Sequence, residues 1–241
     1  LSLTYLLEGK LNEGFPLYEY RFKNNRDFRW PKPSLTWDGS SRVAGKRFLV
    51  YEEQGLGDII QFSRYLTMLE NEGALVTFKV TSKIHKLLAT MPNSITLTET
   101  NLDENQIDFE TPLMSLPFLF KTNITNIPSQ KSYLYACPEK VASLSRELSG
   151  ASFKIGICWQ GAISKVDTGR SFPLALFRDI SKLPNIELIS LHKGEGEGQI
   201  SSIDFKLNNL GSNLDAGEDA FLDTAAVMMG CNLIITSDTA V

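Results

Sequence analysis

The sequence has few of the residues that build the common metal and nucleophile sites. It contains three cysteines, far apart in the chain, and two histidines, His85 and His192. A structural zinc site or a histidine-based triad is therefore not expected. Cys137 stands alone, whereas Cys158 and Cys231 fall in apolar, strand-like runs. We expect reduced core cysteines of a cytoplasmic protein.

Long apolar runs and a strong charge of either sign are also missing. No run reaches the roughly 18 residues of a membrane span, and no basic leader with a cleavage site opens the chain. The formal charge of −4 gives no indication of a nucleic-acid-binding surface. With 241 residues, 42% hydrophobic and 22% charged, the composition is that of a soluble globular protein with one large or two medium domains. The missing initial methionine and the stop at Val241 suggest a fragment of a longer chain.

The rest of the chain is interpreted relative to residues 52–58, which read Glu-Glu-Gln-Gly-Leu-Gly-Asp. They follow an apolar run at 47–51 that is typical of a buried strand, and they precede helical spacing of apolar residues at 59–66. Such a turn lies at the carboxyl end of a strand, where α/β proteins bind ligands, and Gly55 and Gly57 allow close approach of the backbone. Asp58 stands in the first turn of the helix. The alternative is that Asp58 only caps this helix.

The first 20 residues predict a helix, a turn and a second helix. The pattern Tyr5-x-x-x-Gly9-x-x-x-x-Gly14-x-x-x-Tyr18-x-x-Arg21 resembles the last unit of a tetratricopeptide array. A plain helical hairpin packed on the following domain is the alternative. Residues 26–41 predict an ordered linker, in which Trp30 and Trp37 are apolar anchors.

From residue 45 onward, strand and helix signals alternate. Strands are expected at 47–51, 74–80, 94–98, 107–113, 153–159, 186–191 and 231–236, and helices at 59–66, 84–90, 114–120, 139–150, 174–183 and 219–230. This alternation favours βαβ units with parallel sheets. Two sheet-forming halves joined by the helix at 139–150 imply a cleft between them.

Six motifs stand in order along the chain. They are Glu53-Gln54-Gly55-Leu56-Gly57-Asp58 with Gln61-Phe62-x-Arg64-Tyr65, then Gly156-x-x-Trp159-x-Gly161, Arg170-Ser171-x-Pro173-Leu174, Ser190-Leu191-x-Lys193-Gly194, Asp223-Thr224-Ala225-Ala226 and Ser237-Asp238-Thr239-Ala240-Val241. Together they resemble the glycosyltransferase domain that follows tetratricopeptide repeats in many bacterial proteins. That domain is similar to the ADP-heptose:lipopolysaccharide heptosyltransferases, and more distantly to O-linked N-acetylglucosamine transferases.

The resemblance implies an α/β fold of the GT-B type, with two Rossmann-like domains facing a cleft. Residues 1–40 would be the helical hairpin and linker, 41–150 the acceptor domain, and 151–241 the nucleotide-sugar-binding domain. The family continues past the motif at 237–241 with a histidine-bearing helix and further strands. The second domain is therefore expected to be incomplete and the fragment inactive.

The resemblance also implies roles for particular residues. Asp58 is the candidate general base, and Gln54, Gly55 and Gly57 form the acceptor-side loop. The residues implied for donor binding are Trp159, Gln160, Arg170, Ser171, Lys193, Asp238, Thr239 and Ala240. The sequence has no Asp-x-Asp motif, so cationic side chains and helix N-termini are expected to neutralise the diphosphate, with no metal and no cofactor.

Several of these residues have simpler alternatives. Arg170 would be a solvated arginine, Lys193 a surface lysine, Trp159 a core residue, and the Asp238 turn a helix cap. His192 also stands where related sequences commonly carry glutamine, which bears on contacts with the nucleotide base.

The function implied is metal-independent, inverting transfer of a sugar from a nucleotide-sugar to a hydroxyl of a glycan, lipid or protein, with a possible protein partner at the tetratricopeptide region. The alternative is a non-catalytic scaffold or nucleotide-binding module. An NAD-dependent oxidoreductase is disfavoured because the turn lacks a third glycine, and because Val80-Thr81 replaces the expected acidic residue.

Overall fold

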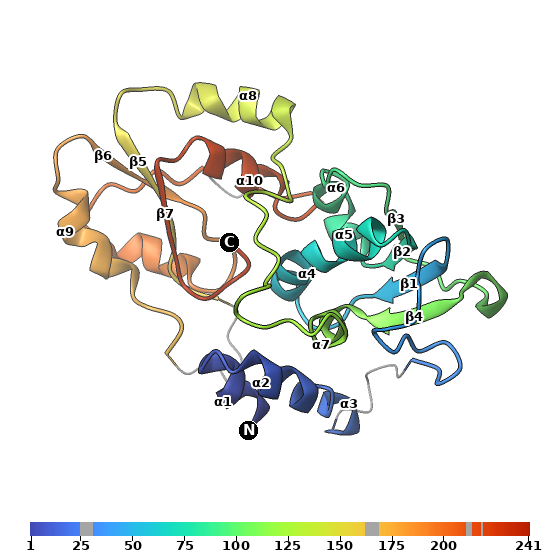
Figure 1. The fold of residues 1–241 in the computed structure, drawn as a ribbon. Coiled ribbons are helices and arrows are strands. Elements are labelled where there is room, and N and C mark those ends of the chain that lie inside the picture. Colours follow the sequence, from blue (N-terminus) through green and yellow to red (C-terminus); the bar gives the residue numbers. More distant parts are fainter. Residues whose placement is uncertain (25–30, 162–168, 211–213, 218) are drawn as a thin grey trace. The chain divides into compact units, whose positions relative to one another are not determined.

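The computed structural model describes residues 1–24, 31–161, 169–210, 214–217 and 219–241. Trp30, the start of the expected linker and loop positions 162–168 lie outside the described residues. The chain divides into two compact units, Leu1–Tyr133 and Leu134–Val241 (Figure 1). This division falls earlier than the expected boundary at residue 150. The reason is that α8 (Pro138–Glu147) packs on α10 (Leu222–Met229) and so belongs to the second unit.

The first unit contains a helical segment and a four-stranded sheet. Its helices are α1 (Ser2–Leu7), α2 (Leu11–Tyr18), α3 (Arg21–Asn24), α4 (Leu56–Phe62), α5 (Arg64–Asn71), α6 (His85–Leu88) and α7 (Leu116–Leu119), with short 3-10 turns η1 (Ser82–Ile84), η2 (Glu104–Gln106) and η3 (Leu113–Ser115). Its strands are β1 (Arg47–Tyr51), β2 (Leu75–Lys79), β3 (Thr96–Thr98) and β4 (Phe109–Pro112). They lie in the order β3-β2-β1-β4, and every pairing is parallel. The expected parallel sheet is confirmed.

Strand β1 lies inside this sheet, which explains its composition. Phe48, Leu49 and Val50 are all buried, so both faces of the strand are covered. Strands covered on both faces are continuously apolar rather than alternating. In Figure 1, α4 and α5 run along one side of the sheet. Trp37 packs edge-on against Phe48 at 5.5 Å between ring centroids, which confirms its role as an apolar anchor.

The expected hairpin at the N-terminus is present as α1 and α2. Gly9 lies between the two helices with φ of +73°, a conformation that glycine adopts without strain. Gly14 is buried where the helices cross, because a Cβ atom there would lie 2.5 Å from Cδ2 of Leu6. The hairpin belongs to the same compact unit as the sheet.

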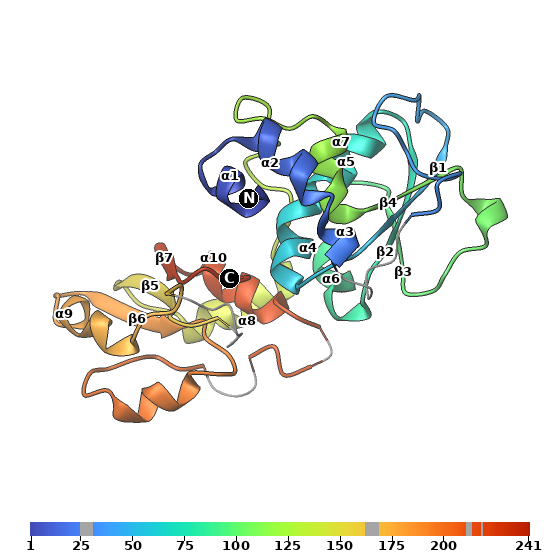
Figure 2. The same cartoon turned by 90° about the horizontal axis from the view of Figure 1, so that it is seen from below.

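The second unit is a three-stranded parallel sheet covered by helices. Its strands are β5 (Phe153–Cys158), β6 (Ile186–Ser190) and β7 (Leu233–Thr236), in the order β6-β5-β7. Besides α8 and α10 it contains α9 (Arg178–Ser181) and the 3-10 turns η4 (Leu174–Phe177) and η5 (Glu197–Ser202). Figure 2 shows α8 and α10 side by side, as they also appear in Figure 1.

Alternate residues of β5 face two separate core clusters. Ile155, Ile157 and then Trp159 pack with Leu174 and Phe177 of η4. Cys158 lies on the other face, in a cluster built with α8 and α10. This two-sided packing is typical of a doubly wound sheet.

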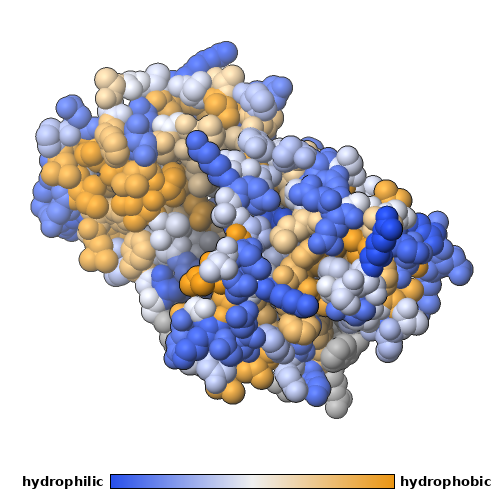
Figure 3. Space-filling view, viewed as in Figure 1, coloured by the Kyte–Doolittle hydropathy of each residue, from blue (hydrophilic) through white to orange (hydrophobic). Residues whose placement is uncertain are grey.

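Part of the second unit's apolar surface stays exposed. Figure 3 shows a broad apolar area there. The side chains of Leu176, Leu183 and Leu233 are all exposed. Within the described residues, β7 pairs with β5 alone and forms an edge of the sheet. No described helix is both long and apolar enough to cross a membrane.

Candidate functional site

The turn after β1 gathers the candidate acceptor-side residues in the first unit. Asp58 is half-buried in the first turn of α4, and its Oδ2 accepts a hydrogen bond of 3.1 Å from the Gly55 amide. This contact is the capping interaction that the sequence left open as an alternative. It holds the Asp58 carboxylate beside the exposed Gln54 and Gly55.

The unusual backbone conformation in this turn is at Gln54 rather than at a glycine. Gln54 has φ of +65°, whereas Gly55 is extended with φ of −92°. A residue with a side chain pays a steric cost in the left-handed region, and such outliers persist where neighbouring groups fix them. Here the Gln54 amide Nε2 donates to the Tyr18 hydroxyl on α2. From the sequence we expected Gly55 and Gly57 to provide the unusual backbone conformation of this turn, but Gln54 adopts it instead.

In the second unit, the carboxyl ends of β5 and β7 bring four candidate positions together: Gly161, Arg170, Ser171 and Asp238. The Gly161 amide donates to Ser171 Oγ at 3.4 Å. A Cβ atom on Gly161 would lie 3.6 Å from the Arg170 guanidinium carbon and 3.4 Å from the Asp238 carbonyl oxygen. Both distances are ordinary van der Waals contacts, so Gly161 packs closely against Arg170 and Asp238. We call these four residues the Arg170 cluster.

A buried hydroxyl adjoins the Arg170 cluster. Ser237 is 4% exposed, and its amide donates to the Cys158 carbonyl at 2.8 Å. Its Oγ is buried without a hydrogen-bond partner among the described residues. Buried hydroxyls are normally paired, so this one marks a place where a ligand or a water is expected. Sequence reasoning quoted Ser237 in a motif but gave it no role. Thr239 and Ala240 follow Asp238 directly, and both are half-buried.

Trp159 and Gln160 are placed differently from the Arg170 cluster. Trp159 is fully buried, stacks on His192 with centroids 4.0 Å apart, and donates from Nε1 to the Gly196 carbonyl at 3.2 Å. Its indole therefore has a core position under the loop that follows β6. Gln160 accepts a hydrogen bond from Gln199 at 3.2 Å. A direct contact of Trp159 with a ligand stays a prediction.

Lys193, on the loop that follows β6, is exposed, and its ammonium group is hydrogen-bonded to backbone carbonyls. Its ammonium donates to the Leu214 carbonyl at 2.8 Å and to the Asp215 carbonyl. Asp215 in turn caps α10, since its carboxylate accepts from the amides of Asp223 at 2.7 Å and Thr224 at 3.2 Å. An ammonium has three donors, and the described residues accept two of those on Lys193.

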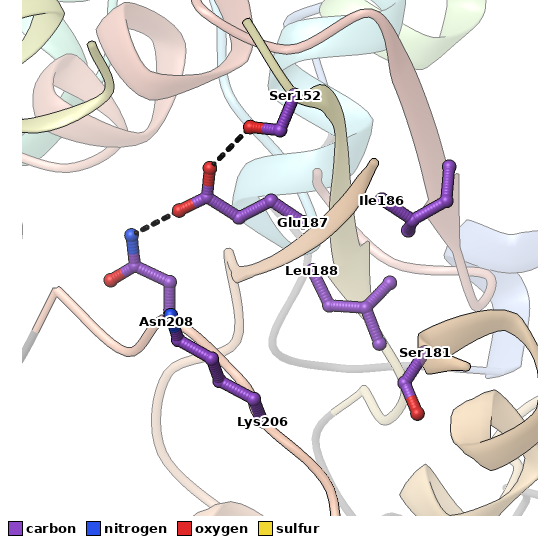
Figure 4. Close-up of a pocket in the computed structure, with 7 residues that line it drawn as sticks. All are labelled: Ser152, Ser181, Ile186, Glu187, Leu188, Lys206 and Asn208. Atoms are coloured by element: carbon purple, nitrogen blue, oxygen red, sulfur yellow. Dashed lines mark hydrogen bonds between the residues drawn. The ribbon is translucent and has the colours of Figure 1, made fainter. Parts of the chain in front are cut away.

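A pocket of about 300 Å³ lies elsewhere in the second unit. It is lined by Ser152, Ser181, Ile186, Glu187, Leu188, Lys206 and Asn208 (Figure 4). Burial alone would raise the pKa of the Glu187 carboxyl, but the hydrogen bonds from Asn208 and Ser152 and the charges of Lys154 and Lys206 together lower it. Ser152 lies just before β5 and Ile186, Glu187 and Leu188 lie in the first half of β6, so the pocket is at the amino ends of these strands. The end of α9 and the segment after η5 complete the lining. Ligands of such sheets bind at the carboxyl ends, so this pocket is separate from the Arg170 cluster.

The described residues contain no group of three histidine, cysteine or acidic side chains arranged to hold a metal. All three cysteines are free thiols, and burial raises the pKa of the Cys158 thiol.

Comparison with known proteins gives a fold and a remote relative. No family model matches the sequence. Protein FlbA of Caulobacter vibrioides is 25% identical over 256 aligned positions, which cover 94% of this chain and 42% of FlbA. The chain thus spans about two fifths of the length of that relative.

Two solved structures share the architecture. One is a family 9 glycosyl transferase from Veillonella parvula, with a TM-score of 0.58 and 14% identity over 84% of this chain and 78% of that one. The other is ADP-heptose lipopolysaccharide heptosyltransferase II of E. coli, with a TM-score of 0.56 and 13% identity over 80% of each chain. The chain has the GT-B glycosyltransferase fold. At these identities the likeness concerns the fold alone.

Proposed function

We propose that the protein is a glycosyltransferase that moves a sugar from a nucleotide-sugar donor to an acceptor hydroxyl, with inversion and without a metal ion. The observation that carries the proposal is the fold shared with two glycosyltransferases, combined with the Arg170 cluster at the carboxyl ends of β5 and β7. In this fold class ligands bind at those strand ends.

The second unit supplies the charges for the leaving group. Breaking the bond between the anomeric carbon and the diphosphate leaves negative charge on the departing nucleotide. The Arg170 guanidinium would stabilise that charge with two parallel hydrogen bonds, and Lys193 would add a further positive charge. The Ser237 hydroxyl, which has no hydrogen-bond partner among the described residues, would be a further donor beside the cluster.

The first unit supplies the base. Asp58 would take the proton of the acceptor hydroxyl as its oxygen attacks the anomeric carbon. Attack from the face opposite the leaving nucleotide inverts the configuration at that carbon. Asp58 keeps its second carboxylate oxygen for this role while Oδ2 binds the Gly55 amide.

Nucleotide binding by the full-length protein tests the proposal. We would titrate it calorimetrically with ADP, GDP and UDP, with and without EDTA, and compare wild type with Arg170→Ala. We expect one nucleotide to bind regardless of EDTA, and Arg170→Ala to weaken that binding about tenfold or more, which corresponds to about 1.4 kcal/mol.

Arg178→Ala is the matched control. Arg178 belongs to the same unit but lies on the surface of α9, where it pairs with Asp204 at 2.8 Å. We expect this variant to bind nucleotide like wild type. A folded protein that binds none of the three nucleotides would contradict the proposal.

That negative result would favour a scaffold. Leu3 and Leu7 lie one turn apart on α1 and are 64% and 89% exposed. Exposed leucines at this spacing are typical of a helix that packs on another protein segment.

A further inference from the structure

Two sequence motifs that lie far apart in the chain meet in the first unit. Arg21 ends the tetratricopeptide-like pattern, and Glu53 opens the turn that leads to Asp58. Arg21 donates from Nε to Glu53 Oε2 at 2.8 Å and from Nη2 to Oε1 at 2.7 Å. The two side chains are only 8% and 2% exposed. This is a bidentate ion pair shielded from water, whose geometry is fixed by the planar guanidinium.

The other hydrogen-bonding groups of this pair are also matched. Arg21 Nη1 donates to Glu19 at 2.7 Å, and Nη2 donates to Ser115 Oγ at 2.8 Å. Glu53 also accepts the Met114 amide at 3.1 Å. Burying two charges is costly unless each is paired and hydrogen-bonded, and here both conditions hold. Glu53 therefore has one well-defined position.

A second contact fixes the next residue of the turn. The Gln54 side chain donates to the Tyr18 hydroxyl, while its backbone lies in the left-handed region with φ of +65°. The Tyr18 ring also lies 4.8 Å from the Arg21 guanidinium carbon. Gln54 is followed by Gly55, whose amide binds Asp58. The backbone conformation at Gln54 thus orients the amide to which the Asp58 carboxylate is bonded.

We propose that Tyr18 and Arg21 are positioning residues, which hold the turn at residues 53–58 in the conformation that presents Asp58. The helices α2 and α3, which carry Tyr18 and Arg21, then help to position Asp58 and do not only pack against the sheet. The inference rests on the proposed function only in assigning Asp58 to the acceptor.

Hydrogen exchange in the full-length protein tests the positioning without any ligand. The amides to follow are those of Gly55 and Ile59, whose bonds to Asp58 Oδ2 and to the Gly55 carbonyl close the turn. Tyr18→Phe removes a single hydroxyl, and Arg21→Lys keeps the charge but loses the bidentate fork. We expect each to speed exchange at the two amides by about tenfold. The thermal midpoint should stay unchanged in Tyr18→Phe, whereas Arg21→Lys should lower it, because Glu53 is then left with incompletely matched hydrogen bonds.

Arg47→Lys is the matched control, because Arg47 also pairs with a carboxylate in this unit, that of Asp108, but at the opposite end of β1 and half in solvent. We expect wild-type exchange in the turn for this variant. Unchanged exchange in both test variants, or faster exchange spread evenly over the unit, would overturn the proposal.

A catalytic readout separates positioning from a purely structural role. With the donor identified by calorimetry, Tyr18→Phe should lower kcat while the nucleotide Kd stays at the wild-type value. Equal kcat in both proteins would overturn the link to Asp58. If no nucleotide binds wild type, the proposed function fails, whereas the exchange result still decides whether the turn is held by Tyr18 and Arg21.

Discussion

His192 is the residue whose surroundings depart most from what its sequence position indicated. Its ring is buried and stacked on Trp159. Nε2 lies 2.7 Å from the Glu195 carbonyl, which only accepts, so Nε2 carries the proton. Nδ1 faces the Cys158 thiol at 3.5 Å. Burial favours the neutral form of the imidazole, which packs under the loop after β6.

Burial lowers the pKa of His192, and this gives a prediction for stability. The carbonyl of Glu195 and the nearby Glu197 act in the opposite direction but do not compensate. The unfolded chain takes up the proton near its ordinary pKa of about 6.5, whereas the folded protein takes it up only at lower pH. Below about pH 6.5 unfolding thus binds a proton, and the free energy of unfolding falls as the pH falls.

Urea unfolding from pH 7.5 down to 5.5 measures this contribution. We expect wild type to lose stability more steeply than His192→Gln over that range, because the carboxyl groups common to both proteins contribute equally. Parallel curves for the two proteins would contradict the proposed burial of a neutral imidazole.

At the scale of elements, the loop after β6 depends on glycines in unequal ways. Gly194 and Gly196 have φ of +92° and +100°. A Cβ atom on Gly196 would also lie 2.6 Å from Gln160 Oε1 and 3.1 Å from His192 Nε2. At Gly194 and Gly198 a Cβ atom would meet nothing within 4 Å among the described residues.

Three alanine variants separate strain from steric overlap in this loop. We expect Gly198→Ala to change the free energy of unfolding by less than about 0.5 kcal/mol. Gly194→Ala should cost about 1 kcal/mol through backbone strain alone. Gly196→Ala also displaces the Gln160 amide, which would lose its bond from Gln199, and should cost about 2 kcal/mol in total. Chemical unfolding measures all three, and equal costs at positions 194 and 196 would contradict the close packing on Gln160.

The strands were predictable from sequence, and the helices were less so. Every strand of the described residues falls inside an expected strand. The reason is that buried parallel strands appear in a sequence as short apolar runs. The helix expected at 59–66 is instead α4 and α5, separated at Ser63, whose hydroxyl binds the Ile60 carbonyl at 2.9 Å. The helix expected at 174–183 begins as η4. Apolar spacing does not encode such breaks, because they depend on hydrogen bonds of individual side chains.

At the scale of the whole molecule, the candidate residues fall into two groups, one in each unit. Arg170, Ser171 and Asp238 were implied as candidates by the resemblance to the glycosyltransferase family, and their meeting around Gly161 required the three-dimensional structure. The contact of Arg21 with Glu53 could not be anticipated, since the two residues lie 32 positions apart and nothing local pairs them. For the same reason the core position of Trp159 and the carbonyl contacts of Lys193 required the three-dimensional structure.

If the two units divide the work as proposed, one substitution in the first unit should affect chemistry without affecting nucleotide binding. Asp58→Asn keeps a side-chain oxygen to accept the Gly55 amide, so the cap on α4 is retained. It removes the group that takes up the proton. We expect the nucleotide Kd to equal that of wild type and the rate of sugar transfer to fall by about 10²–10⁴.

The measurement is the release of nucleotide from the donor sugar in the presence of an acceptor extract. Asp103→Asn is the control, because Asp103 also caps a turn in the first unit, where its carboxylate accepts from the Asn105 amide at 3.0 Å. This variant should turn over like wild type, since a cap alone contributes stability and not proton transfer. Full activity of Asp58→Asn would reduce Asp58 to the same structural role as Asp103, and the base would have to be sought elsewhere in the first unit.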